Sequence, residues 1–131
     1  MQFTTKVRVR YAETDQMGVV YHANYLIYLE VSRVEALRKL GVKYSELEQQ
    51  GILFPVVDLH VQYLRPAFYD QELTVSTQFL QINPKQIIIE NQIWNDQNIV
   101  ILKAKVILVC VDKMTMRATT IPAEILNVFQ K

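Results

Sequence analysis

The sequence predicts an α+β protein in which a curved antiparallel sheet of about five strands wraps around one long central helix. Alternating segments typical of strands make up much of the 131 residues, and one long segment has helical spacing. Most of the strand segments follow one another instead of alternating with helices. This order is typical of α+β proteins rather than of doubly wound parallel sheets. The length predicts a single domain over residues 1–131.

The first strand is predicted in residues 3–13, where apolar and cationic residues alternate. The two faces would carry Val7, Val9 and Tyr11 on one side and Lys6, Arg8 and Arg10 on the other. We expect the apolar face to turn toward the core.

The long helix is predicted in residues 24–41, with Gly41 as the residue that ends it. Leucines recur at helical spacing, and Ile27, Tyr28 and Val31 make its first half apolar on nearly every side. A helix of this kind is usually buried. Its charged residues are spaced as i,i+3 pairs, namely Glu30 with Arg33 and Glu35 with Arg38.

A short second helix is predicted in residues 43–51, capped by Ser45 and ended by Gly51. Four strands follow, in residues 55–64, 70–82, 86–94 and 99–111. The first of these four alternates Val57, Leu59, Val61 and Tyr63 with Asp58, His60 and Gln62. His60 is therefore expected to face solvent and to have no role in a site.

Turn residues separate the later strands. Asn83 and Pro84 predict a turn after the second of the four, and residues 95–98 predict a hairpin between the last two. The last strand is apolar on both faces over several residues, as expected of a strand with a neighbour on each side. Residues 122–131 begin with proline and predict a closing helix. An open sheet of this kind exposes its edges, and pairing with a second copy is the simplest cover.

The composition excludes several classes of function. The net charge is +1 with dispersed cations, which argues against nucleic acid as a partner. Cys110 is the only cysteine and there are two histidines, so neither a disulfide nor a zinc site is expected. No segment resembles a signal peptide or approaches the length of a membrane span. A cytoplasmic protein is expected.

The stretch ETDQMGVVYHANY, residues 13–25, joins the first strand to the long helix. In it, Asp15 is a potential base or nucleophile, and His22 has a polar side chain able to orient a substrate or water. The start of the helix offers free N–H groups for an oxyanion, and Gly18 allows a close turn past a ligand. Each residue also has a structural explanation, because aspartate commonly forms turns or caps helices and a histidine can simply be packed.

This sparse set of residues favours thioester chemistry. The sequence has no G-x-S-x-G motif, and its single cysteine has no evident partner for acyl-enzyme catalysis. A thiol has a pKa near ~8.5 and leaves without a strong general acid. A carboxylate beside an oxyanion-stabilising helix end therefore suffices for a thioester, whereas an amide would require more.

The stretch YAETDQMGVVYHANY resembles the signature of hotdog-fold acyl-CoA thioesterases of the 4-hydroxybenzoyl-CoA thioesterase type. It is most similar to the branch that includes the thioesterase encoded with the bacterial Tol–Pal system. The resemblance continues through YLEVSRVEALRKLG and VQYLRPAFYDQELTV and covers essentially the whole chain. It implies an acyl-CoA substrate, no cofactor, and homodimers joined edge to edge, often paired again into tetramers. It also implies active sites at the dimer interface.

The resemblance also implies roles for individual residues. Asp15 matches the catalytic carboxylate, the backbone N–H of His22 would point at the thioester carbonyl, and Tyr11 would flank the site. The expected substrate-binding residues are Gly18, Tyr25, Glu30, Phe54 and Lys85. Lys85 matches one member of a basic cluster for the coenzyme A phosphates, but Asn83 and Pro84 replace the others. Phe54 replaces a smaller polar residue. Tyr11 as a core residue and Glu30 as the ion-pair partner of Arg33 are the structural alternatives.

The expected function is hydrolysis of an acyl-CoA to a carboxylate and free coenzyme A. Asp15 would either activate water or attack the carbonyl, and the sequence leaves both routes open. Two alternatives are a hotdog dehydratase, whose usual histidine motif differs from QMGVVYHANY, and a non-catalytic binder of acyl thioesters. The acyl group, the choice between coenzyme A and acyl carrier protein, and the pathway are not determined by these residues.

Overall fold

The computed structural model describes residues 2–129, apart from the side chain of Gln81. Its helices are α1 (Tyr25–Lys39), α2 (Tyr44–Gln49) and α3 (Ala123–Phe129), with 3-10 turns at Tyr11–Glu13 and His22–Asn24. Its strands are β1 (Gln2–Arg8), β2 (Ile52–Leu53), β3 (Val56–Tyr63), β4 (Glu72–Ile82), β5 (Gln86–Trp94), β6 (Val100–Val109) and β7 (Val111–Asp112). No helix in this part of the chain is both long and apolar enough to span a membrane.

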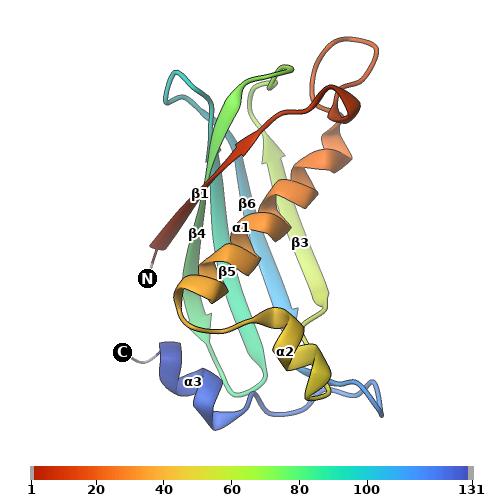
Figure 1. Ribbon diagram of the computed structural model, residues 1–131, viewed down its shortest axis with the longest axis vertical. Helices are drawn as coiled ribbons and strands as arrows, with labels where there is room; N and C mark the ends of the chain where they lie inside the picture. The colour runs from red at the N-terminus through yellow and green to blue at the C-terminus, as the bar shows by residue number, and fades with distance from the viewer. Residues whose placement is uncertain (1, 130–131) are drawn as a thin grey trace.

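Five strands form one antiparallel sheet in the order β1-β4-β5-β6-β3, and α1 crosses one face of it (Figure 1). The predicted fold class and the number of long strands are confirmed. β2 and β7 add a separate two-stranded ribbon. Pairing shifts by one residue between Phe79 and Gln81 in β4, and irregularities of this kind increase the bend and twist of a sheet.

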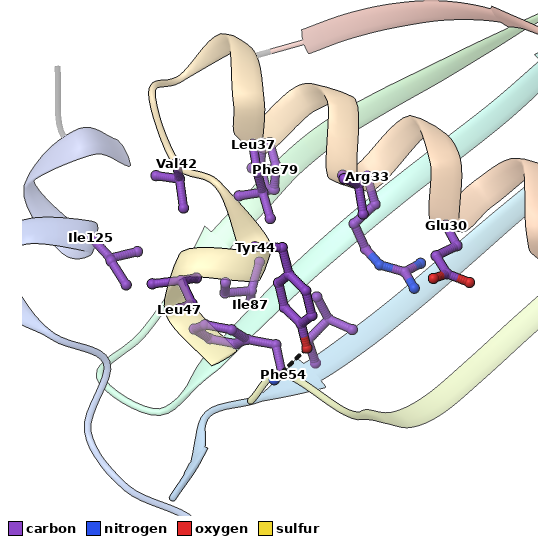
Figure 2. Close-up of a pocket in the computed structure, with 12 residues that line it drawn as sticks. Glu30, Arg33, Leu37, Val42, Tyr44, Leu47, Phe54, Phe79, Ile87 and Ile125 are labelled. Atoms are coloured by element: carbon purple, nitrogen blue, oxygen red, sulfur yellow. Dashed lines mark hydrogen bonds between the residues drawn. The ribbon is translucent and has the colours of Figure 1, made fainter. Parts of the chain in front are cut away.

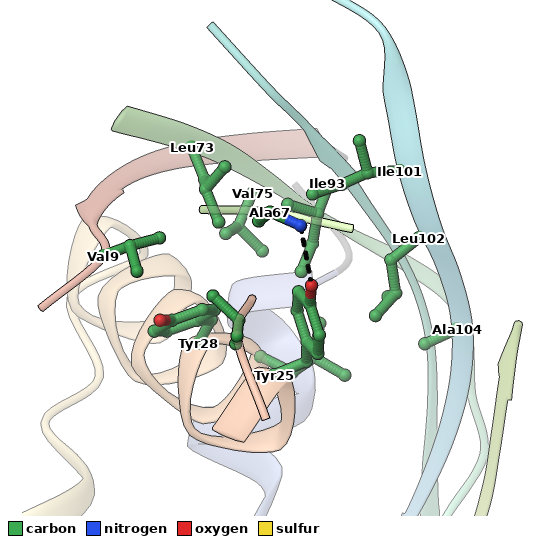
Figure 3. Packing of buried hydrophobic residues seen from close by; sticks show 12 residues of the cluster. Val9, Tyr25, Tyr28, Ala67, Leu73, Val75, Ile93, Ile101, Leu102 and Ala104 are labelled. Carbon is green, nitrogen blue, oxygen red and sulfur yellow. Dashed lines mark hydrogen bonds between the residues drawn. The ribbon is translucent and has the colours of Figure 1, made fainter. Parts of the chain in front are cut away.

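The core between α1 and the sheet consists of two apolar clusters. Figure 3 shows the first, in which Tyr25 and Tyr28 of α1 pack near Leu73 and Ile93 of the sheet. The second lies toward α2 and α3 and includes Leu37. Burying apolar surface against a sheet is the main stabilising contribution to such a fold.

A buried polar group also joins helix and sheet. The hydroxyls of Ser32 and Thr77 are hydrogen-bonded to each other, and the Asn91 amide donates to the Thr77 hydroxyl at 3.1 Å. Buried polar atoms are tolerated when they find partners in this way, and the described residues have no buried side-chain N or O atom without one.

The ends of the helices are partly as predicted. Gly41 and Gly51 follow the two helices with φ of 88° and 86°, which is the left-handed conformation that glycine adopts at helix ends. The prediction of Ser45 as a cap is wrong. Lys43 occupies the N-cap position and Ser45 lies inside α2.

The first strand ends earlier than predicted. β1 stops at Arg8, and Tyr11 begins a 3-10 turn in which its side chain is 77% exposed. Val7 and Val9 do face the core, but Tyr11 does not fill it. The expected strand over 99–111 is interrupted at Cys110, which separates β6 from β7. The closing helix is present over Ala123–Phe129, and residues 130 and 131 of its predicted span lie outside the described residues.

The helix α1 is not buried on all sides of the single chain. Leu26, Ile27 and Val31 are exposed. The ion pair between Glu35 and Arg38 is present at 3.4 Å. No ion pair forms between Glu30 and Arg33, whose side chains instead line a cavity described below.

Candidate active site

The loop that carries Asp15 is a small hairpin, which we call the Asp15 loop (residues 14–20). Thr14 and Val20 form an isolated antiparallel bridge at its base, and the Asp15 N–H donates to the Val19 carbonyl at 2.8 Å. Gly18 has φ of 80° and donates its N–H to the Asp15 carbonyl at 3.0 Å. Only glycine adopts this φ without strain, so its position in the sequence determines where the chain turns.

Asp15 holds the tip of this loop with its own side chain. Its Oδ1 accepts the N–H of Met17 at 2.8 Å and that of Val19 at 3.4 Å. An aspartate that bonds the backbone two residues later is a common turn element. The predicted structural role of Asp15 is therefore present, and it holds the carboxylate in one orientation.

An open hollow of about 700 Å³ lies beside the carboxylate. Its lining residues are Tyr11, Ala12, Thr14, Asp15, Gln16, Gly18 and Tyr69. Three residues predicted for the site, Tyr11, Asp15 and Gly18, are thus brought together. The rings of Tyr11 and Tyr69 meet edge to face, with centroids 5.6 Å apart. Tyr69 was missed by sequence reasoning, because it lies 54 positions after Asp15 in an unremarkable turn.

The start of the central helix lies directly after this loop. His22–Asn24 form a 3-10 turn that continues into α1. Among the described residues, the backbone N–H groups of His22 and Ala23 have no acceptor. Free N–H groups at a helix start carry partial positive charge and are suited to an oxyanion.

The His22 ring is exposed and does not line the hollow of Asp15. It lies against Tyr21, with ring centroids 4.4 Å apart, and meets Tyr63 of β3 edge to face at 6.4 Å. The Tyr63 hydroxyl donates to the His22 carbonyl at 2.9 Å. β3 therefore holds the start of the helix through Tyr63.

Tyr25 is buried in the core behind the loop. Its hydroxyl accepts the N–H of Ala67 at 3.1 Å, as Figure 3 shows. Burial raises the pKa of Tyr25, the bond from Ala67 opposes this, and the charges of Tyr63 and Asp15 raise it further. The phenol is therefore neutral.

Glu30 and Phe54 lie away from Asp15 in the single chain. Both line a cavity of about 90 Å³ between α1, α2 and the sheet (Figure 2). The cavity is mostly apolar, and the Phe54 N–H donates to the Tyr44 hydroxyl at 3.0 Å on its wall. Burial lowers the pKa of Arg33 beside it, while Glu30 and Tyr44 oppose that shift.

Lys85 is also distant from Asp15. It lies in the turn between β4 and β5, after Ile82, whereas the Asp15 loop follows the end of β1 that pairs with Glu72. Lys85 and the Asp15 loop therefore lie at opposite ends of the eleven-residue strand β4, whose extended length is roughly 35 Å. The residues described form no group of three or more His, Cys, Asp or Glu suited to a metal ion.

Comparison with known proteins identifies the class of protein to which this chain belongs. The family model described as the thioesterase-like superfamily matches residues 9–129. A putative acyl-CoA thioesterase of Bacillus subtilis, YneP, is 40% identical over 112 residues, covering 86% of this chain and 81% of its own length. An acyl-CoA thioesterase of Haemophilus influenzae, YbgC, is 35% identical and is aligned over 97% of this chain and 93% of its own.

A solved thioesterase structure also matches this chain. The structure of a DHNA-CoA thioesterase from Staphylococcus aureus has a TM-score of 0.95 and 30% identity, and the match covers 98% of this chain and 89% of that one. The chain belongs to the thioesterase-like superfamily and has the hotdog fold. The resemblance inferred from the Asp15 loop is confirmed, and the similarity to YbgC fits the predicted branch, the one that includes the thioesterase encoded with the Tol–Pal system.

Proposed function

We propose that the protein hydrolyses acyl-CoA thioesters, consuming water and releasing a carboxylate, a proton and free coenzyme A. Of the relatives named above, YbgC is an acyl-CoA thioesterase and YneP is named as a putative one, and the match spans almost the full length of YbgC. The observation that carries the proposal is the Asp15 carboxylate, held in one orientation at an open hollow, in a loop that is followed directly by the free N–H groups at the start of α1.

Two routes use this geometry. In the first, Asp15 takes a proton from water, which then attacks the thioester carbonyl. In the second, Asp15 attacks the carbonyl itself to give an anhydride, which water then hydrolyses. In both, negative charge develops on the carbonyl oxygen, and the N–H groups of His22 and Ala23 would stabilise it. The thiolate then leaves and takes up a proton.

The assignment of substrate-contacting residues follows the lining of the hollow. Tyr11, Gly18 and Tyr69 surround the carboxylate and would contact the thioester. The His22 ring is accessible and would orient the reacting groups from the helix side. Tyr25 would support Asp15 without touching the substrate, because its side chain is buried.

A homodimer is part of the proposal, and the exposed residues of β3 support it. Among the described residues β3 is an edge strand and pairs with β6 alone. Its side chains Val56, Val57, Leu59 and Tyr63 are exposed, as are Leu26, Ile27 and Val31 of the adjacent α1. An apolar edge strand is an aggregation hazard unless it is covered. A second copy paired antiparallel along β3 would cover both sets of side chains.

This pairing would also complete the active site. The Asp15 loop lies at the Tyr63 end of β3, and Phe54 lies just before its Val56 end. A two-fold axis near the middle of β3 would bring the partner's Asp15 loop toward Phe54 and Glu30 of this chain. The cavity beside these two residues would then receive the acyl group, and Lys85 would remain near the surface for the coenzyme A phosphates. Tetramer formation and a cytoplasmic location remain predictions.

Hydrolysis of a panel of acyl-CoA thioesters tests the proposal. Free thiol would be measured for straight, branched and aromatic acyl groups, with wild type and Asp15→Asn compared. Release by wild type and its loss in the variant are expected. The assignment fails if wild type releases no thiol above background, or if Asp15→Asn keeps full activity.

A single turnover in ¹⁸O-labelled water tests for attack by Asp15 on the carbonyl. If Asp15 attacks the carbonyl, hydrolysis of the anhydride can leave label in the Asp15 carboxylate, which mass spectrometry of the loop peptide detects. If Asp15 acts as a base, label appears only in the released acid. The oligomeric state would be measured by light scattering of the same preparation.

A further inference from the structure

Glu13 lies just before the Asp15 loop, and its carboxylate is buried although it carries charge. The residue is 6% exposed. A buried carboxylate is tolerated only when its oxygens are well paired. Glu13 Oε1 accepts the backbone N–H of Arg10 and the hydroxyl of Tyr28, each at 2.8 Å. Its Oε2 accepts Nε and Nη2 of Arg10 at 3.2 and 3.0 Å.

The backbone of Glu13 makes a second set of contacts. Its carbonyl accepts the N–H of Tyr21 at 2.9 Å and the side-chain amide of Asn24 at 2.8 Å. Tyr21 closes the Asp15 loop, and Asn24 precedes the first residue of α1. One residue therefore contacts both ends of the loop, the 3-10 turn that offers the free N–H groups, and, through Tyr28, the first turn of α1.

We propose that Glu13 is a positioning residue for the hydrolysis, which holds the Asp15 carboxylate and the N–H groups of His22 and Ala23 in a fixed mutual geometry. The inference rests on the proposed function, because it assumes that these groups act on one thioester. Catalysis depends strongly on such geometry, and a displacement of about 1 Å can reduce a rate by roughly 100-fold. Glu13 does not line the hollow and would act only through its neighbours.

The charge on Glu13 fits this role. Burial raises the pKa of Glu13, but the bonds from the Arg10 backbone, the Tyr28 hydroxyl and the Arg10 side chain, together with the Arg10 charge, lower it overall. Burial and the same carboxylate raise the pKa of Tyr28, so its hydroxyl stays a donor. The Glu13 carboxylate is thus a charged hydrogen-bond acceptor surrounded by hydrogen-bond donors.

The variant Glu13→Gln tests the role with little change in shape. The glutamine NH₂ group would face the N–H groups of Arg10 or the hydroxyl of Tyr28, which are also donors. These hydrogen bonds would therefore be lost without a large cavity being created. We expect kcat to fall by about 10- to 100-fold with KM within roughly 2-fold of wild type. Glu13→Asp, which keeps the charge, is expected to recover part of the lost kcat.

Glu35→Gln is the matched control. Glu35 also pairs with an arginine at i,i+3, at 3.4 Å from Arg38, but its side chain is 40% exposed and it lies in the last part of α1. Its removal should leave kcat and KM unchanged. Should Glu13→Gln fail to fold, Tyr28→Phe removes a single bond to the carboxylate and is expected to lower kcat by about 3- to 10-fold.

Amide hydrogen exchange provides a measurement that does not depend on activity. The N–H groups of Asp15, Gly18 and Val20 are hydrogen-bonded in wild type. They should exchange roughly tenfold faster in Glu13→Gln, while core amides of β5 keep their protection. The inference is overturned if folded Glu13→Gln keeps wild-type kcat or unchanged exchange in the loop. If wild type itself hydrolyses no acyl-CoA, the proposed function fails, and the exchange still decides whether Glu13 anchors the loop.

Discussion

The carboxylate of Asp15 accepts the backbone N–H of Met17 at 2.8 Å, so the residue proposed to react with substrate also closes the turn that carries it. A turn role and a catalytic role appear as alternatives when Asp15 is considered in the sequence alone. In the structure they are compatible, because a carboxylate has several acceptor positions and the turn uses only part of them.

Replacement of Asp15 by asparagine separates the two roles. The asparagine side chain keeps an oxygen that can accept the Met17 N–H, but it can neither take a proton nor attack a carbonyl. We expect a loss of activity of about 10²- to 10⁴-fold with a change in unfolding free energy within about 0.5 kcal/mol. Thiol release and thermal unfolding measure these effects.

The matched control is Asp112→Asn. Asp112 forms the same kind of turn, accepting the N–H groups of Met114 and Thr115 at 2.8 and 3.2 Å, far along the chain from the loop. This variant should keep full activity. Equal losses in the two variants would contradict a chemical role for Asp15.

Gly18→Ala tests the conformation of the loop. Nothing lies within 4 Å of the position that a Cβ would take, so the cost arises from φ of 80° and is expected to be about 1–2 kcal/mol. Gly51→Ala carries the same strain at φ of 86° and also has open space, but it lies after α2. Similar losses of stability are expected, with kcat lowered by roughly tenfold only in Gly18→Ala. Equal kcat values for both variants would show that the loop conformation is not needed.

Tyr69→Ala tests the wall of the hollow. Tyr69 packs edge to face with Tyr11 but is 55% exposed, so little stability should be lost. Aromatic contacts of this kind contribute about 0.5–1.5 kcal/mol, which corresponds to a rise in KM of roughly 2- to 10-fold. Tyr69→Phe keeps the ring and should retain a KM near wild type. A KM unchanged in Tyr69→Ala would remove Tyr69 from the site.

Leu59→Asp tests the dimer. Leu59 lies on β3, where a charge would be buried against the second copy, and monomers are expected by light scattering. Leu80→Asp is the control, because Leu80 is similarly exposed but lies on β4, away from the free edge of β3. It should leave the oligomeric state unchanged. Dimers that persist in Leu59→Asp would exclude pairing along β3, and an active monomer would show that one chain completes the site.

The stability contributed by Glu13 is expected to depend on pH. Because its pKa in the folded protein lies below the ordinary value of 4.5, the carboxylate stabilises the fold above pH 4.5. This contribution is lost as the pH falls through the lowered pKa. The difference in unfolding free energy between wild type and Glu13→Gln should therefore be largest near neutrality and shrink below pH 4.5. Denaturant unfolding at several pH values measures it, and a difference that grows with acidity would contradict the paired carboxylate.

Patterns repeated over many residues predicted the fold well. The strands that became β4 and β5 and the helix α1 were found within two residues of their observed ends, because alternation and helical spacing are averaged over long segments. Single positions were less predictable. Tyr11 follows two inward-facing valines at the correct spacing, yet the chain leaves the sheet after Arg8 and turns its ring outward. Ser45 has the chemistry of a cap, but α2 begins one residue earlier.

Some residues of the candidate site were also predictable from the sequence, and others were not. Asp15, Gly18 and Tyr11 are close in the sequence, and their type and spacing pointed to the loop that borders the hollow. Tyr69 comes from a distant turn, and the burial of Glu13 depends on Arg10 and Tyr28 meeting around it. No local pattern indicates either feature, since both arise from contacts between separate segments.

The sequence by itself determined the α+β class, the ends of the main helix and the loop whose residues match the thioesterase signature, because each is encoded in local periodicity or in a contiguous motif. Only the tertiary structure decided that β3 is an edge strand, that Glu30 and Phe54 lie away from Asp15 within one chain, and that the Glu13 carboxylate is buried and paired. The physical reason is that strand order, edges and burial depend on which distant segments pack together, and packing is a property of the whole chain.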